Sequence, residues 1–479
     1  MLLCLNEIEK TYNDRLLFKS DEFIIYPNER IGLIGVNGAG KSTFLKILSG
    51  EIEPDSGYVI RYCDINVIAQ LDCGEITEPD GRFSKLFQSP KKYADFYSGG
   101  EKTRLKIASG LSGNAGLLLA DEPTTNLDIS GIELVKRQLL AFKGSVVLIS
   151  HDQSLLNELC TRIVEIENGK IINFQGNYSD YLCEKKRLLK EQERKYDEYK
   201  QENSKLKQAR IQALQQAKNL KKAPSRMGNS EARLHKREAE MSKKSIQSRA
   251  NSIGSRLERL EKIERPRELP NIRMAFSNFD IGTSKYPIFL QNINLSFQDK
   301  ILLENADFEI ARGSKTVLFG DNGCGKTTFL NYIMNNYPFP QSIIPAYFSQ
   351  DFSAFLREDQ TVIENAKRIT DRDETIIRTV MARLLIKDVN KLIKVLSGGE
   401  RCKICIGCIL LSKANFVVLD EPTNHLDLYS IQALADVLTA YPGTLLFVTH
   451  DRSFAQKVAD NFLKIENRKI AGVASVTYE

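Results

Sequence analysis

The sequence predicts an α/β fold with two related domains in tandem, joined by a long α-helical hairpin. Three observations support this prediction: a glycine-rich loop occurs twice between a strand pattern and a helical pattern, further motifs recur at a fixed spacing, and a basic segment with heptad-like spacing separates the two sets. We expect the first domain at residues 1–180, the hairpin at 181–268 and the second domain at 269–479.

The motifs in the second part of each domain recur at one offset of 299 residues. The recurring pairs are Ser98 and Ser397, Asp121 and Asp420, Glu122 and Glu421, Asp128 and Asp427, and His151 and His450. A register that is kept over this length indicates an internal duplication.

Each domain opens with a loop of the pattern G-x-x-x-x-G-K-[ST], at residues 35–42 and 320–327. An apolar strand pattern precedes each loop and a helical pattern follows it, which is the setting that this motif requires. The glycines turn backbone N–H groups toward phosphates, and the helix N-terminus adds favourable potential. The loop residues expected to bind ATP are Gly35, Asn37, Gly38, Gly40, Lys41, Ser42 and Thr43, and in the second loop Gly320, Asn322, Gly323, Gly325, Lys326, Thr327 and Thr328.

Two carboxylates end a buried-strand pattern in each domain, at residues 117–122 and 416–421. Asp121 and Asp420 are expected to hold Mg²⁺ through water, together with the hydroxyls of Ser42 and Thr327. The following residues, Glu122 and Glu421, are the predicted catalytic bases, because a carboxylate in this place can orient the attacking water and accept its proton. The sequence therefore predicts an ATPase.

These motifs resemble those of the ABC ATPases over nearly all of both domains. The family signature is present as Ser98-Gly99-Gly100-Glu101 and Ser397-Gly398-Gly399-Glu400. The resemblance implies Q-loop glutamines that help to hold Mg²⁺, D-loop aspartates and catalytic switch histidines, at Gln70 and Gln350, Asp128 and Asp427, and His151 and His450. Tyr12 and Phe297 occupy the place where the family stacks an aromatic ring on adenine, although either residue could equally be a core aromatic at a strand edge.

In this family the two nucleotide domains pack head to tail, with each ATP between the phosphate loop of one domain and the signature of the other. The resemblance implies one site that joins Lys41, Ser42, Gln70, Asp121, Glu122 and His151 to Ser397 and Gly399. The other site would join Lys326, Thr327, Gln350, Asp420, Glu421 and His450 to Ser98 and Gly100. We therefore expect a monomer whose two domains pair within the chain, closed by ATP and opened by hydrolysis.

Apolar runs and cysteines bear on location. The longest uncharged apolar runs, residues 144–150 and 444–449, are far below the roughly 18 residues of a membrane span. No signal peptide precedes the strand pattern at the N-terminus, and nine cysteines without a paired framework fit a reduced compartment, so a cytoplasmic protein is expected. Cys402, Cys405 and Cys408 have metal-ligand spacing, but buried thiols on one helix are the favoured interpretation.

The connecting segment concentrates the positive charge. Residues 184–267 contain 25 Lys and Arg against 12 Asp and Glu, a net charge of +13, whereas the rest of the chain carries −7. Apolar residues keep heptad-like spacing on both sides of a break, which predicts a hairpin with arms of roughly 35 to 40 residues. We expect the tip at residues 220–230, with residues 238–245 as the alternative. A segment this basic suits a polyanionic partner, with a solvated hairpin that binds nothing as the other interpretation.

Two ABC domains joined by a long basic hairpin resemble the ABC-F family of ribosome-binding translation factors. The resemblance implies that the linker enters the tRNA exit site of the bacterial 70S ribosome, where Lys and Arg contact rRNA phosphates and the tip meets the P-site tRNA or the drug-site wall.

Spacing within this family favours one subgroup. The distance from Gln70 to Ser98 is 28 residues, against 47 from Gln350 to Ser397, so the region where housekeeping members carry an added arm is shortened here. This feature and the sequences at 121–128 and 225–234 are similar to antibiotic-resistance ABC-F proteins of Gram-positive bacteria, which protect the ribosome from pleuromutilins, lincosamides and streptogramins A.

Three alternatives stay open. The first is a housekeeping ABC-F factor that relieves stalled ribosomes without drugs. The second is the fused ATPase subunit of a transporter, which would need a separate permease and a shorter linker. The third is a DNA-associated ABC protein, which would split one domain across a coiled coil, whereas both domains here are whole.

Overall fold

The computed structural model of the chain describes residues 1–12, 15–69, 79–89, 99–125, 127–219, 229–260, 262–263, 276, 279–298, 300–349, 355–424 and 426–473. The chain divides into two compact units, Met1–Tyr181 together with Leu269–Glu479, and Leu182–Glu268. Within the described residues, no helix is both long and apolar enough to span a bilayer.

The first domain is built on a sheet with the strand order β4-β1-β2-β9-β8-β3-β7-β6-β5. Strands β8, β3, β7, β6 and β5 are parallel, while β1 pairs antiparallel with β2 and β4. The elements are β1 (Leu3–Tyr12), β2 (Arg15–Ile25), β3 (Arg30–Gly35), α1 (Lys41–Ser49), β4 (Ser56–Arg61), β5 (Ile65–Ile68), α2 (Gly81–Leu86), α3 (Gly99–Gly110), β6 (Leu117–Asp121), α4 (Ile129–Ala141), β7 (Ser145–Ile149), α5 (Gln153–Leu159), β8 (Arg162–Glu167) and β9 (Lys170–Gln175).

The second domain repeats this plan, with a sheet ordered β13-β14-β15-β12-β16-β17 and a separate antiparallel pair, β10 and β11. Its elements are β10 (Ile288–Phe297), β11 (Lys300–Ile310), β12 (Lys315–Phe319), α8 (Lys326–Asn336), β13 (Pro345–Phe348), α9 (Val362–Ile369), α10 (Glu374–Arg383), the 3₁₀ turn η2 (Ile393–Val395), α11 (Gly398–Leu411), β14 (Phe416–Asp420), α12 (Leu428–Ala440), β15 (Thr444–Val448), α13 (Arg452–Val458), β16 (Asn461–Glu466) and β17 (Lys469–Val473).

The two domains share one topology, which confirms the predicted α/β fold and the duplication. The parallel order β5-β6-β7-β3-β8 of the first domain matches β13-β14-β15-β12-β16 of the second. In each domain the helix after the phosphate loop buries a phenylalanine under the antiparallel strands: Phe44 contacts Phe18 edge-on with ring centroids 5.4 Å apart, and Phe329 contacts Phe308 at 4.9 Å. This packing holds each phosphate loop against its sheet.

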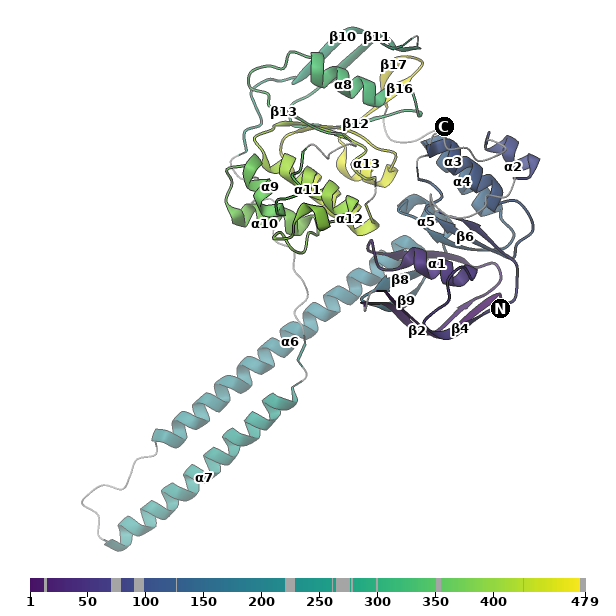
Figure 1. The fold of residues 1–479 in the computed structure, drawn as a ribbon. Helices are drawn as coiled ribbons and strands as arrows, with labels where there is room; N and C mark the ends of the chain where they lie inside the picture. The colour runs from purple at the N-terminus through teal and green to yellow at the C-terminus, as the bar shows by residue number, and fades with distance from the viewer. Residues whose placement is uncertain are drawn as a thin grey trace. The chain divides into compact units, whose positions relative to one another are not determined.

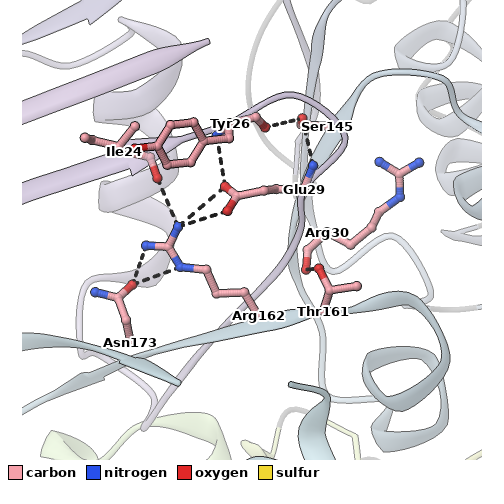
Figure 2. A network of polar contacts seen from close by, with 8 residues as sticks. All are labelled: Ile24, Tyr26, Glu29, Arg30, Ser145, Thr161, Arg162 and Asn173. Carbon is pink, nitrogen blue, oxygen red and sulfur yellow. Dashed lines mark hydrogen bonds and ion pairs between the residues drawn. The ribbon is translucent and has the colours of Figure 1, made fainter. Parts of the chain in front are cut away.

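A polar network secures the start of β3, the strand that leads to the first phosphate loop (Figure 2). The Arg162 guanidinium on β8 donates to the carbonyl oxygen of Ile24 at 3.0 Å and to Asn173 Oδ1 on β9 at 2.6 Å, and it lies 3.5 Å from the Glu29 carboxylate. The backbone N–H of Glu29 in turn donates to Ser145 Oγ on β7 at 3.2 Å. Because one cluster ties β2, β7, β8 and β9 to this end of β3, the loop at its other end is attached to a rigid strand.

The second unit is a helical hairpin (Figure 1). Helix α6 (Tyr178–Asn219) and helix α7 (Asn229–Arg259) lie side by side, joined by an ion pair between Arg256 and Glu202 with N and O 2.8 Å apart. The two helices have 42 and 31 residues, close to the predicted arms. The favoured tip at 220–230 falls largely outside the described residues. The alternative tip at 238–245 is wrong, because α7 continues through it: no proline or glycine interrupts the helical pattern there.

Candidate active site

Both phosphate loops have the geometry that anion binding requires. The residues that cap α1 and α8, Gly40 and Gly325, have φ angles of 97° and 103°, which glycine adopts without strain. The Lys41 ammonium donates to the carbonyl oxygen of Gly35 at 2.8 Å, and the Lys326 ammonium donates to that of Gly320 at 2.7 Å. Each buried lysine is therefore held over its loop, beside the N-terminus of a helix.

The residues expected to hold Mg²⁺ lie together in both domains. Thr327 Oγ1 donates to Asp420 Oδ2 at 2.8 Å, and the Ser42 hydroxyl is hydrogen-bonded to Asp121 in the same way. Asp420 Oδ1 is buried and has no hydrogen-bond partner among the described residues, so it can accept from metal-bound water. A carboxylate and a hydroxyl placed beside a phosphate loop form a donor set that fits Mg²⁺.

The two predicted catalytic bases share an unusual backbone conformation. Glu122 and Glu421 both have a φ angle of 50°, in the left-handed region that a non-glycine residue enters at a cost of about 1 kcal/mol or more. In each, the backbone N–H donates to the next strand, from Glu122 to Ile149 at 2.9 Å and from Glu421 to Val448 at 3.0 Å. The sheet thus holds both glutamates in a strained backbone conformation, and such conformations are concentrated at functional sites.

Each predicted base lies close to the predicted switch histidine of the same domain. His151 Nε2 lies 3.1 Å from Glu122 Oε1, and His450 Nε2 lies 3.3 Å from Glu421 Oε1, although neither pair is aligned as a hydrogen bond. Burial, with the neighbouring Asp121, raises the pKa of Glu122 to about 8, and burial raises that of Glu421 to about 7. Burial and the nearby lysines lower the pKa of both histidines to about 4, so both imidazoles are neutral at pH 7.

The D-loop aspartates connect the two domains. Asp427 Oδ2 accepts a hydrogen bond from the backbone N–H of Asn37 in the first phosphate loop at 2.9 Å. The reciprocal contact is also present, because the backbone N–H of Asn322 in the second loop is hydrogen-bonded to Asp128. Although burial opposes the shift, hydrogen bonds lower the pKa of both aspartates, mainly from the N–H of Gly131 for Asp128 and from the N–H of Asn37 for Asp427. The paired aspartates therefore place each phosphate loop against the opposite domain.

A cavity of about 520 Å³ lies where the two domains meet. Its walls combine residues of the second site with residues of the first domain: Asn322, Lys326, Thr327, Asp420, Glu421 and His450 face Glu122, Thr125, His151 and Asp152. Gly320 and Gly100 are not part of its lining, and Ser98 lies outside the described residues. The cavity thus brings together the predicted bases and the predicted switch histidines of both sites.

The other predicted residues fall into three groups. Ser397 caps α11, with Glu400 completing the capping box, and Gly398 and Gly399 form its first turn as Gly99 and Gly100 do in α3. The aromatic residues at the strand ends, Tyr12 and Phe297, are 59% and 58% exposed, which fits a ring free to stack on adenine better than a core residue. Gln70 and Gln350 lie outside the described residues.

One residue near the second site was not predicted. The Tyr347 hydroxyl on β13 lies 3.5 Å from Asp420 Oδ2, beside the Thr327 contact. The only signal in the sequence is a tyrosine three positions before Gln350, where the first domain has Val67. Its approach to Asp420 depends on the pairing of β13 with β14, which local sequence does not reveal.

The cysteine triad is buried in the second domain. Cys402, Cys405 and Cys408 all lie on α11 within the hydrophobic core, and burial raises the pKa of each thiol. No group of His, Cys, Asp and Glu in the described part of the chain has the arrangement of a metal site. The buried-thiol interpretation therefore accounts for the spacing.

Comparison with known proteins agrees with the site geometry. A family model described as ABC transporter matches residues 18–94 and 303–424, and a second model of the same description matches 164–276. The chain is 32% identical to the ribosome protection protein VmlR of Bacillus subtilis, over 98% of this chain and 87% of that protein. It is 31% identical to the erythromycin resistance ATP-binding protein MsrA of Staphylococcus epidermidis, over 97% of this chain and 98% of that protein.

More distant relatives extend the same comparison. ABC transporter F family member 5 of Arabidopsis thaliana is 28% identical over 97% of the chain and 75% of its own length. Among solved structures, an archaeal ribosome recycling factor in complex with a ribosomal stalk protein shares the fold, with a TM-score of 0.65 and 18% identity over 98% of this chain and 90% of that chain.

Fold and paired sites together define a tandem ABC ATPase, which binds and hydrolyses ATP. Within that class, the chain belongs to the ABC-F family.

Proposed function

We propose that this protein binds the bacterial 70S ribosome and protects it from antibiotics of the peptidyl-transferase centre. The observation that carries the proposal is the similarity to VmlR and MsrA, which runs through both domains and the linker and covers nearly the whole chain. The names of these two relatives refer to ribosome protection and to erythromycin resistance.

The charge of the linker supports a polyanionic partner. In the described part of α6 after Asn203, the charged residues are all basic, and Lys205, Lys207 and Arg210 are exposed. Lys243, Lys244 and Arg249 on α7 are exposed as well. Such side chains can neutralise rRNA phosphates and release their counterions, which gives affinity without sequence specificity.

The active site supports a cycle in which ATP closes the two domains and hydrolysis opens them. We propose that Lys41 and Lys326 bind the terminal phosphates, and that Glu122 and Glu421 accept a proton from the attacking water. Mg²⁺ held by Ser42 with Asp121, and by Thr327 with Asp420, would neutralise charge on the phosphates. His151 and His450 would orient their glutamates. The protein would then leave the ribosome after hydrolysis.

The test is translation of a reporter by purified bacterial ribosomes with a pleuromutilin, a lincosamide or a streptogramin A. We expect the wild-type protein with ATP to restore synthesis in the presence of at least one drug. The matched control is Glu122→Gln with Glu421→Gln, which keeps the fold and nucleotide binding but cannot release. If the wild type binds ribosomes and restores synthesis with none of the three drugs, the protection proposal is wrong.

A housekeeping role is the second candidate. The observation that favours it is that relatives of 28% identity, such as the Arabidopsis F family member, match 97% of the chain without a drug in their names. The same assay separates the two roles, because a housekeeping factor would accelerate synthesis on a stalling message in the absence of any drug.

A further inference from the structure

A buried polar cluster joins the base of the linker helix to the second domain. Glu165 on β8 is 1% exposed, and Tyr181 on α6 is fully buried. The Tyr181 hydroxyl donates to Glu165 Oε1 at 3.0 Å, and the Tyr429 hydroxyl on α12 donates to the same oxygen. The two hydroxyl oxygens lie 2.7 Å apart. One turn further along α12, Gln432 Nε2 donates to the Tyr178 hydroxyl at 3.2 Å.

This cluster lies next to one ATP site in the chain. Tyr429 follows Asp427 by two residues, and Asp427 both caps α12, through the N–H of Ser430 at 2.8 Å, and accepts from the N–H of Asn37. The N-terminus of α12 is therefore held from two sides, by the first phosphate loop through Asp427 and by the first turn of α6 through Tyr429. A displacement of this helix end on one side must be transmitted to the other side, or it must break a hydrogen bond to a buried carboxylate.

Among the described residues, the other D-loop has different contacts at the corresponding positions. The 299-residue register aligns Tyr429 with Ser130, whose hydroxyl donates to Asp128 itself at 3.0 Å. It aligns Glu165 with Lys464, which pairs with Glu466 at 2.8 Å.

The second contact of the cluster is also replaced. Gln432 corresponds to Glu133, which pairs with Arg452 on α13 at 2.9 Å. The two ATP sites thus have the same motifs, but the side chains beside their D-loops make different contacts.

We propose that Tyr181 and Tyr429 are positioning residues that couple the ATP site of Lys41 and Glu122 to the first turn of the linker helix α6, and that the site of Lys326 and Glu421 has no equivalent coupling. Glu165 is the shared acceptor through which the two tyrosines act. The proposal rests on the ATPase activity and the contacts above, and the experiment contains no ribosomes, so its outcome is independent of the ribosomal role.

The test separates the two sites by inactivating one base at a time. Glu421→Gln leaves Glu122 as the only base, and Glu122→Gln leaves Glu421. Tyr181→Phe and Tyr429→Phe are placed in each background, and the rate of the first ATP hydrolysis event after mixing is measured. In the Glu421→Gln background we expect each phenylalanine to slow this event about fivefold, the effect of one lost hydrogen bond. In the Glu122→Gln background we expect no change.

A matched control tests for a general loss of packing. Tyr441 is buried like Tyr181, and its hydroxyl donates to the carbonyl oxygen of Ala414 at 2.7 Å. It lies at the C-terminal end of α12, opposite the end that Asp427 caps. Tyr441→Phe should not change the difference between the rates of the two backgrounds. Both tyrosines act through Glu165, so their effects on the rate should not be independent. We therefore expect the double variant Tyr181→Phe with Tyr429→Phe to slow the first hydrolysis event less than the product of the two single slowing factors.

A second readout measures the effect of ATP binding on the linker helix. Cys183, two residues after Tyr181, is an exposed thiol that can carry a spin label. In the Glu421→Gln background we expect ATP to change the mobility of this label, and we expect Tyr429→Phe to abolish the change, because coupling between two sites is reciprocal. Equal slowing of both backgrounds by Tyr181→Phe and Tyr429→Phe, or a label response that survives Tyr429→Phe, would overturn the proposal.

Discussion

Asp427 accepts a hydrogen bond from the backbone N–H of Asn37, 2.9 Å away across the two domains and 390 residues earlier in the chain. The same carboxylate accepts from the N–H of Ser430 and so caps α12. One side chain therefore contributes both to the stability of a helix and to the contact between a D-loop and the opposite phosphate loop.

This double role predicts the behaviour of two substitutions. Asp427→Ala removes the cap and the contact with Asn37, so we expect the midpoint of thermal unfolding to fall by about 2 to 4 °C, as the loss of a cap worth about 1 kcal/mol implies. Asp427→Asn keeps one oxygen, which can still accept from the N–H of Ser430 and cap α12, but it places an NH2 group against the N–H of Asn37, so it should recover only part of the midpoint. Circular dichroism on heating measures both variants, and an unchanged midpoint for Asp427→Ala would contradict the capping role.

The catalytic bases give the next prediction. We expect Glu122→Gln with Glu421→Gln to lower steady-state ATP turnover by roughly a hundredfold or more, because a positioned general base contributes about that factor. ATP binding should survive, since the lysines and phosphate loops are unchanged, and the variant should stay on ribosomes in ATP. Phosphate release and co-sedimentation provide the two measurements, and turnover at the wild-type rate would refute the assignment of the bases.

The cysteines should differ in reactivity by burial. Burial raises the pKa of Cys402 and Cys408 to about 12, so at pH 8 only about one thiol in ten thousand is a thiolate. We expect a maleimide to modify Cys183, which is exposed, and to leave the α11 cysteines unmodified until the protein is unfolded in guanidinium. Peptide mass spectrometry resolves the positions, and rapid modification of Cys405 in the native protein would show that α11 is not packed as described.

Salt should separate electrostatic from other contacts if the linker binds rRNA. We expect ribosome affinity to fall steeply with salt, with each neutralised phosphate contributing about 0.7 to 0.9 to the logarithmic slope. Replacing Lys205, Lys207 and Arg210 with Gln should therefore reduce the slope by about 2. Lys413→Gln, in the second domain and 80% exposed, is the matched control and should leave it unchanged. Salt-insensitive binding would indicate protein contacts in place of rRNA.

The linker tip should decide protection without deciding affinity. Replacing residues 221–230 with a Gly/Ser loop of equal length should leave ATPase activity and most ribosome binding intact, because basic residues along both arms supply the affinity. Protection from a pleuromutilin or lincosamide should be lost, because only the tip would reach the drug site. A variant that still protects fully would assign protection to another part of the protein.

Much of the architecture can be predicted from local sequence. The loops at Gly35 and Gly320, the carboxylates at Asp121 and Asp420 and the hairpin arms are each encoded in a short segment, since backbone conformation, helical period and charge depend on neighbours along the chain. The duplicated register carries this further, because it predicts that both domains share one topology, as the sheets show.

The sequence by itself thus determined an ABC ATPase with two complete motif sets, a basic helical linker and its candidate bases. Only the tertiary structure decided that Glu122 and Glu421 have left-handed backbones, that Tyr347 approaches Asp420, and that Tyr429 shares a buried carboxylate with Tyr181. These features depend on side chains far apart in the chain that meet when strands and helices pack. A local sequence pattern does not reveal such a contact, so residues at equivalent positions of the two repeats can have different partners.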